Sequence, residues 1–142
     1  MKPLRELWPF SRLLPRRKKP LGQRGEDLAA KRIRRGGLKI LARNYRCPAG
    51  EADIIALQKP AAPADGEGTI VFVEVKTRAG EQAVLAESAV DARKRRQIAN
   101  VARYYLSHHA DGQFSARFDV VAVIIPPQGK PQVRHIADAF QP

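Results

Sequence analysis

Cysteine and histidine are scarce in this 142-residue chain, which contains one cysteine and three histidines. The single Cys47 cannot form an internal disulfide, and no Cys or His residues stand at the spacing of a zinc site. Nothing in the sequence provides Cys47 with a neighbouring base, so we interpret it as an ordinary packed side chain and not as a nucleophile. A chain without disulfides is typical of a reducing compartment, and we therefore expect a cytoplasmic protein.

Long apolar runs are missing as well. No segment approaches the ~20 consecutive apolar residues that cross a bilayer, so the sequence predicts no membrane span. Prolines interrupt the apolar residues of the first 20 positions, which leaves no signal-peptide core. Hydrophobic residues make up 44% and charged residues 28% of the chain, a composition that predicts one globular domain over residues 21–142.

Acidic residues are outnumbered by basic ones, with 14 Asp and Glu against 26 Lys and Arg and a net charge of +12. This excess favours a polyanionic partner, above all nucleic acid, with an anionic lipid surface as the competing interpretation. Residues 1–20 contain seven of the cations and one acid, Glu6. We expect them to form a disordered basic arm, which either tethers nucleic acid or serves as a solubilising tail.

Residues 69–78 are predicted to form the central strand of the fold, because β-branched and aromatic residues fill them. Glu74 and Lys76 interrupt this apolar pattern, and they share one face of the strand because successive side chains alternate. The structural alternative is a surface strand with an ion pair, which contributes less than about 1 kcal/mol and has no functional consequence.

A second strand is predicted over residues 50–57, where Glu51 and Asp53 share a face. Pairing of the two strands as a hairpin would bring Asp53 and Glu74 together with Lys76. Two carboxylates, a backbone carbonyl and several waters form the oxygen shell that Mg²⁺ prefers, and Mn²⁺ accepts the same ligands. Such a metal would polarise a phosphoryl oxygen while the lysine stabilises the attacking hydroxide or the developing charge, so the chemistry would be phosphodiester hydrolysis.

Asp53 followed by Glu74-Val75-Lys76 resembles the Asp…Glu-x-Lys core of the PD-(D/E)xK nuclease superfamily. From Gly22 to about Pro126 the chain also resembles the YraN-like family of uncharacterised bacterial proteins. The motifs that carry this second resemblance are Gly25-Glu26, Asn44-Tyr45-Arg46, Gly50-Glu51-Ala52-Asp53, Phe72-Val73-Glu74-Val75-Lys76-Thr77-Arg78 and Arg117-Phe118-Asp119.

The two resemblances imply an α/β, restriction endonuclease-like fold, in which helices flank a mixed β-sheet as in the archaeal Holliday junction resolvases. They also imply that a glutamate of the N-terminal helix joins the metal site, and Glu26 occupies the matching position.

Hydrophobic periodicity predicts the remaining elements. They are a helix over 22–35, a strand over 38–45, a helix from about residue 87 or 88 to 108, a buried strand over 117–125 and a strand over 132–136.

Cations gather in the second of these helices, directly after the proposed metal strand, and Lys94 is the first choice for a phosphate contact. His108 and His109 at the end of this helix are interpreted as capping residues. Arg117 and Asp119 share a face of their strand and pair either with each other or with the site, and of the two we expect a structural pair. The residues assigned to nucleic-acid contact are Arg46, Arg78, Arg93, Lys94, Arg95 and Arg96.

We therefore predict a Mg²⁺-dependent nuclease that acts on DNA, with branched or damaged DNA as the structure-specific version. Asp53 and Glu74 are the predicted metal ligands, Lys76 positions water and stabilises charge, Glu26 completes or orients the shell, and Glu51 supports it. Cutting two strands would usually need a homodimer. Two alternatives stay open: a non-catalytic nucleic-acid-binding protein on the same scaffold, and a peripheral membrane-associated adaptor that uses the basic arm.

Overall fold

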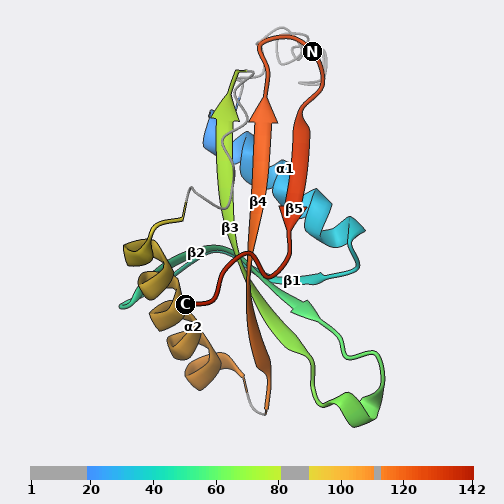
Figure 1. Ribbon diagram of the computed structural model, residues 1–142, viewed down its shortest axis with the longest axis vertical. Helices are drawn as coiled ribbons and strands as arrows, with labels where there is room; N and C mark the ends of the chain where they lie inside the picture. The colour runs from blue at the N-terminus through green and yellow to red at the C-terminus, as the bar shows by residue number, and fades with distance from the viewer. Residues whose placement is uncertain (1–18, 81–89, 111–112) are drawn as a thin grey trace, which may run out of the picture.

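The computed structural model describes residues 19–80, 90–110 and 113–142. It has the predicted α/β architecture, a five-stranded mixed sheet with two helices, consistent with a restriction endonuclease-like fold (Figure 1). The predicted basic arm lies almost entirely in residues 1–18, outside the described part. In chain order the elements are α1 (Leu21–Arg35), β1 (Lys39–Cys47), β2 (Gly50–Gln58), the short 3-10 helix η3 (Pro63–Asp65), β3 (Thr69–Ala79), α2 (Ala92–His109), β4 (Ser115–Ile125) and β5 (Gln132–Ile136).

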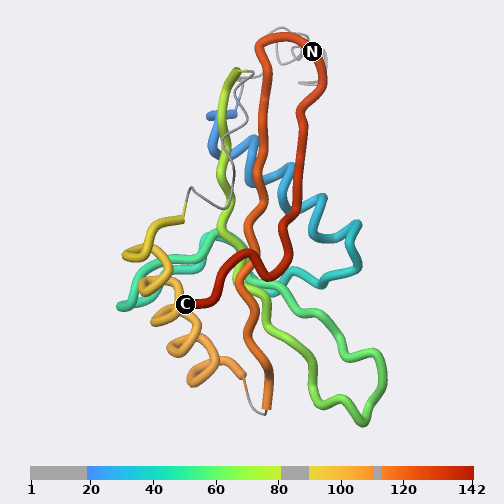
Figure 2. The backbone as a smooth tube through the Cα atoms, viewed as in Figure 1, coloured from blue at the N-terminus to red at the C-terminus, as the bar shows by residue number. Residues whose placement is uncertain are grey.

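The strands follow the order β1-β2-β3-β4-β5 across the sheet. Each neighbouring pair is antiparallel except β3 and β4, which run parallel and pair from Thr69 opposite Ser115 to Ala79 opposite Ile125. Parallel neighbours need a crossover connection, and α2 lies in that connection. Figure 2 shows the paths of β3 and β4 side by side through the length of the molecule. The predicted hairpin of the second and third strands is therefore confirmed, with β3 at the centre of the sheet.

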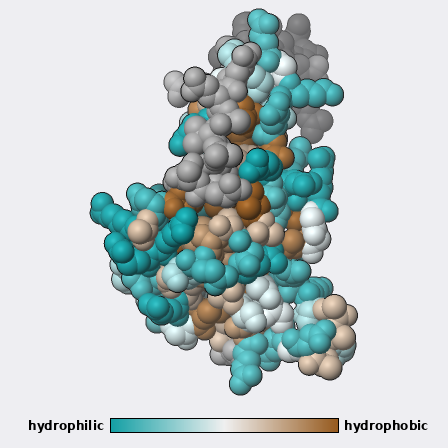
Figure 3. Space-filling view, in the orientation of Figure 1, coloured by the Kyte–Doolittle hydropathy of each residue, from teal (hydrophilic) through white to brown (hydrophobic). Residues whose placement is uncertain are grey.

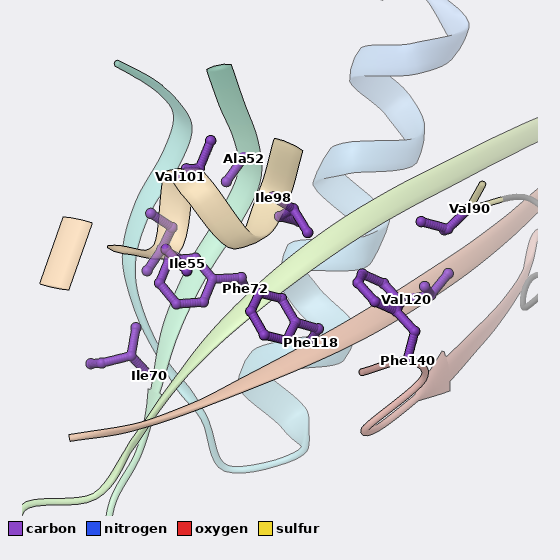
Figure 4. Packing of buried hydrophobic residues seen from close by; sticks show 11 residues of the cluster. Ala52, Ile55, Ile70, Phe72, Val90, Ile98, Val101, Phe118, Val120 and Phe140 are labelled. Carbon is purple, nitrogen blue, oxygen red and sulfur yellow. The ribbon is translucent and has the colours of Figure 1, made fainter. Parts of the chain in front are cut away.

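The two helices cover opposite faces of the sheet because β3 is apolar on both. Phe72 faces α2, whereas Val71 and Val73 face α1, as the alternation of a strand requires. On the α2 face, the rings of Phe72 and Phe118 are stacked with centroids 5.8 Å apart (Figure 4). The helix residues buried against the sheet are Gly25, Ala29, Ala30 and Ile33 from α1 and Ile98, Val101 and Ala102 from α2.

The start of α2 differs from the prediction. The helix begins at Ala92 and not near residue 87, because Asp91 adopts an extended backbone and its Oδ1 accepts a hydrogen bond of 2.9 Å from the amide of Lys94. Val90, expected within the helix, is buried just before this cap. Residues 87–89 lie outside the described part. No helix in the described ranges is long and apolar enough to cross a membrane.

Candidate active site

A pocket opens where β2 and β3 separate. Their pairing ends at Ile54 opposite Val73, so Asp53 and Glu74 are the first residues beyond the last pair. Asp53 Oδ2 accepts a hydrogen bond of 2.8 Å from the amide of Val75 and so satisfies a backbone donor that has lost its partner strand. The pocket has a volume of about 300 Å³ and is lined by Gly22, Glu26, Glu51, Asp53, Glu74, Val75, Lys76, Thr77, Arg78 and Lys94.

Residues from both helices line this pocket, although the helices cover opposite faces of the sheet. Glu26 reaches the pocket from α1, and Lys94 reaches it from α2. The structure thus brings the four predicted catalytic residues, Glu26, Asp53, Glu74 and Lys76, to one pocket, together with the supporting Glu51. Their catalytic roles remain predictions.

Glu74 is the most enclosed charged group of the pocket, with 5% of its surface exposed. Its Oε1 lies 3.3 Å from Lys76 Nζ and 3.6 Å from Lys94 Nζ. Its Oε2 is buried and has no hydrogen-bond partner among the described residues. Two ammonium groups therefore share one carboxylate oxygen while the other is unpartnered, which is unusual because buried polar atoms are nearly always hydrogen-bonded.

Burial raises the pKa of Asp53, and the hydrogen bond from the Val75 amide together with the charge of Lys94 offsets only part of this rise. Burial also raises the pKa of Glu74, and the neighbouring charge of Asp53 raises it further against the opposing effect of Lys94 and Lys76. Both carboxyl groups are therefore harder to ionise than usual, because each is desolvated and Glu74 faces a like charge. A divalent cation placed between them would compensate both effects.

The donor set fits a hard divalent ion held by two carboxylates. No group of three or more His, Cys, Asp or Glu residues in the described part of the chain is arranged to hold a metal. Glu26 lines the pocket without joining Asp53 and Glu74 in such a group, so its role in a metal shell stays a prediction. Mg²⁺ is commonly bound by one or two carboxylates and several waters, and the unpartnered Oε2 of Glu74 offers one such ligand atom.

Gly25 explains how α1 comes close enough for Glu26 to line the pocket. A Cβ added at Gly25 would lie 1.9 Å from Thr77 Oγ1, far inside van der Waals contact. Only glycine therefore allows α1 to lie against β3 at this point. The two residues of the predicted Gly-Glu pair thus have different roles: Gly25 sets the distance between helix and strand, and Glu26 lines the pocket.

The residues assigned to nucleic-acid contact are spread over several places. Arg78 and Lys94 line the pocket, and Arg93 and Lys94 line an adjoining hollow of about 420 Å³. Arg46 lies 3.5 Å from Glu51, and both are exposed. Arg95 instead packs inward. The surface over α2, where Arg93 and Arg96 are exposed, is largely hydrophilic (Figure 3).

The inward contacts of Arg95 place it in the scaffold. Its Nε donates a hydrogen bond of 3.0 Å to the carbonyl of Val90, and its guanidinium lies 5.4 Å from the centre of the Phe140 ring. These contacts tie the start of α2 to the C-terminal segment.

Arg117 and Asp119 form the expected structural pair away from the pocket. Asp119 is fully buried, and the Nε and Nη2 atoms of Arg117 donate to its two oxygens at 2.8 and 2.9 Å. His135 Nε2 lies 2.7 Å from Oδ2, and the amide of Asp138 donates to Oδ1 at 2.9 Å. Burial raises the pKa of Asp119, but its hydrogen bonds from His135 and Arg117 outweigh this and leave the pKa below its usual value.

The predicted cap at the end of α2 is present for His108. Its Nδ1 lies 2.8 Å from the carbonyl oxygen of Tyr104, one turn earlier, and the two rings are stacked with centroids 3.9 Å apart. His109 instead contacts β1, with Nε2 3.2 Å from the hydroxyl of Tyr45.

Comparison with known proteins shows that this chain is similar to the members of one family. Residues 25–123 match the model of the uncharacterised protein family UPF0102. A UPF0102 protein of Pelobacter propionicus is 40% identical over 84% of this chain and 81% of its own length. The UPF0102 proteins of Geobacter sulfurreducens and Frankia alni are 42% and 41% identical, over 87% and 88% of this chain and 90% and 98% of their own lengths.

Proposed function

This chain belongs to UPF0102, the YraN-like family, and from the geometry of its pocket we propose that it is a metal-dependent nuclease that hydrolyses phosphodiester bonds in DNA. One observation carries the proposal: at a pocket that Asp53 also lines, Oε1 of the buried Glu74 lies near two ammonium groups, while its Oε2 has no hydrogen-bond partner among the described residues. A purely structural ion pair would leave no buried carboxylate oxygen without a partner. A cation-binding site would, because that oxygen is the one that binds the cation.

The residues of the pocket have distinct tasks in this proposal. Asp53 and Glu74 hold a Mg²⁺ or Mn²⁺ ion, which when bound supplies positive charge to polarise the phosphoryl oxygen and activate water. Lys76 holds the attacking hydroxide in place and stabilises the charge that develops on the phosphate. Lys94 holds the phosphate from the α2 side, and Glu26 orients a water from the α1 side.

Recognition of DNA in this proposal is electrostatic and largely independent of base sequence. The pocket's cations, Lys76, Arg78 and Lys94, suit phosphate oxygens, and the chain has a net charge of +12. Phosphate contacts position a protein on nucleic acid but carry no sequence information. We therefore expect affinity to fall steeply as salt is raised.

The test is a cleavage assay on branched, nicked, single-stranded and duplex DNA and on RNA, with Mg²⁺, with Mn²⁺ and with a chelator. We expect metal-stimulated cleavage of at least one DNA. Asp53→Asn and Glu74→Gln should abolish it, while Glu67→Gln, the same change at an exposed loop residue, should cleave like wild type.

Binding in metal-free buffer separates the nuclease from its first alternative. The two carboxylate variants should bind DNA as well as wild type or slightly better, because they remove negative charge that faces phosphate. Lys76→Ala should bind slightly more weakly and lose roughly 10²-fold or more in rate. If wild type binds DNA but no metal stimulates cleavage of any substrate, the proposal fails and a non-catalytic nucleic-acid-binding protein is the better description.

A further inference from the structure

The outer face of α1 carries a second group of exposed cations, distinct from those of α2. In the structure α1 lies behind the sheet and α2 in front of it, so the two groups face opposite directions (Figure 1). We call this group the α1 cation surface. It consists of Arg24, Lys31, Arg32, Arg34 and Arg35 on the helix and Lys39 at the start of β1, all exposed.

The described residues of the protein do not neutralise the α1 cation surface. Within the described part of the chain none of its six members forms a salt bridge. The helix has two acids, and both are engaged elsewhere. Glu26 lines the pocket, and Asp27 is held by Lys19 at 2.9 Å and by Arg43 at 2.8 Å.

Helix stability does not account for this concentration of charge. The helix dipole favours cations in the last turn, which would explain Arg32, Arg34 and Arg35. The same dipole disfavours Arg24, which lies in the first turns, and it does not extend to Lys39. Like charges four residues apart, as in Lys31 and Arg35, also repel each other along a helix. An external polyanion would compensate these costs.

We propose that the α1 cation surface binds the phosphate backbone of nucleic acid outside the catalytic pocket, an inference that rests on the proposed function for the identity of the partner. The 15 residues of α1 span about 22 Å. One strand of duplex DNA presents a phosphate about every 3.4 Å along its axis, so the helix matches the length of about six phosphates. Gly22 and Glu26 at the N-terminal end of α1 line the pocket, and a strand bound along the helix is therefore directed toward the catalytic residues.

The structure favours nucleic acid over a lipid surface as the occupant. A helix that lies in a membrane interface inserts its apolar side chains among the lipids. The apolar side of α1 is already packed on the sheet, where Ala29, Ala30 and Ile33 are at most 1% exposed. Among the large apolar side chains of α1, which lies wholly in the described part of the chain, only Leu21 is exposed, at 39%. A lipid surface would thus contact the charged side chains of α1 but not its apolar side.

The test compares two variants with the same change of net charge, in the full-length protein and without divalent metal. Lys31→Gln/Arg35→Gln removes two cations of the α1 cation surface, and Lys59→Gln/Lys130→Gln removes two exposed cations that lie outside it and outside the pocket. Binding to a fluorescein-labelled DNA duplex is measured by anisotropy at several salt concentrations. Circular dichroism confirms that each variant is folded, and Arg24→Gln/Lys39→Gln is the replacement if the first pair is not.

We expect the slope of log K against log salt to fall by about 1.8 for the α1 variant and to stay unchanged for the control, because each phosphate contact contributes about 0.9. At about 0.1 M salt this corresponds to a roughly 10- to 60-fold loss of affinity. Equal losses of DNA affinity in both variants would show that only the net charge of the protein matters, and this would overturn the inference.

Unchanged DNA binding by the α1 variant would also overturn it. If phosphatidylserine vesicles then bind wild type and release the variant, the surface belongs to a lipid. The two hypotheses are tested separately. Metal-dependent cleavage by wild type supports the proposed function whatever the α1 variant does, and a selective loss of DNA binding by the α1 variant supports this inference even if no cleavage is found.

Discussion

Lys94 Nζ on α2 lies 3.6 Å from Glu74 Oε1 on β3, which ties the crossover helix directly to the proposed catalytic strand. Lys76 contacts the same oxygen at 3.3 Å from within the strand. The orientation of α2 is set by packing of its apolar face on Phe72 and by the cap at Asp91. Packing of the helix and electrostatics of the pocket are therefore coupled, since a shift of α2 would move a charge out of contact with Glu74.

This coupling makes a prediction for the ionisation of Glu74. The ammonium of Lys94 lowers the pKa of that carboxyl, so Lys94→Gln should raise it further above its usual value. The measurement is an NMR titration of the Glu74 side-chain carboxyl carbon. Arg93→Gln removes a charge from the same turn of α2 that does not contact Glu74 and is the control. Identical titrations in wild type and Lys94→Gln would show that the two groups are not in contact in solution.

The pH dependence of stability should reveal the same site. Because the pKa values of Asp53 and Glu74 are raised on folding, the folded state binds more protons than the unfolded state between the unfolded and the folded pKa values. The stability contribution of these two groups therefore falls as pH rises through that window. Asp53→Asn/Glu74→Gln should be more stable than wild type at pH 7, and the difference should shrink as pH falls from the raised folded pKa values toward the unfolded values of about 4, below which it should no longer change.

Metal should reverse this effect in wild type alone. At a concentration about 100 times the dissociation constant, Mg²⁺ or Mn²⁺ should stabilise the folded protein by about 2.7 kcal/mol. The melting temperature of Asp53→Asn/Glu74→Gln should not respond to metal. An equal increase in both proteins would place the metal elsewhere and remove the main support for the nuclease.

The elements of the fold were largely predictable because strand and helix periods determine which side chains share a face. Alternation in β3 put Glu74 and Lys76 on one face, and the predicted hairpin of β2 and β3 brings Asp53 close. The contact of Lys94 with Glu74 was not predictable in the same way. The sequence analysis chose Lys94 from the run of cations for a phosphate contact, but only the packing of α2 determines that its ammonium lies beside Glu74.

Two further features depend on information that local patterns do not carry. Asp91 is a favoured capping residue, and weighing it against the apolar Val90 would have placed the start of α2 correctly. The contact of His135 with Asp119 depends on the register of β5 against β4, in which His135 lies opposite Val121. No periodicity within either strand specifies that register.

Asp119 should be far more important for stability than for catalysis. Asp119→Ala leaves Arg117 without its buried partner, and loss of one member of a buried pair costs about 3–5 kcal/mol. Since the pKa of Asp119 is lowered on folding, its contribution is present above its unfolded pKa of about 3.8 and is lost as pH falls through the folded value. Urea unfolding at pH 7 and at lower pH measures both effects.

Asp138→Asn is the matched control for this carboxylate. It keeps the backbone amide that donates to Asp119, and asparagine tolerates the positive φ of 50° at this position. It should change stability by less than about 0.5 kcal/mol. If Asp119→Ala is as stable as Asp138→Asn, the buried network does not hold β5 to β4.

Gly25 should prove essential for the position of α1. The Cβ of Gly25→Ala would overlap Thr77 Oγ1, so either the helix or the strand must move. Overpacking of this kind costs about 1–3 kcal/mol. Gly22→Ala is the control, because a Cβ there meets nothing within 4 Å and alanine favours the helix. In urea unfolding, Gly25→Ala should therefore lower the free energy of unfolding, whereas Gly22→Ala should raise it or change it much less.

A double-mutant cycle with Thr77→Ala then tests whether the contact itself is responsible. Thr77→Ala removes Oγ1 and Cγ2, two of the three atoms that a Cβ at Gly25 would meet, and leaves the strand residue in place. Gly25→Ala should thus cost less in the Thr77→Ala background, with a coupling energy of about 0.5–3 kcal/mol. Coupling near zero would mean that α1 is held elsewhere along the helix, and Glu26 would then owe its place at the pocket to something other than the Gly25 contact.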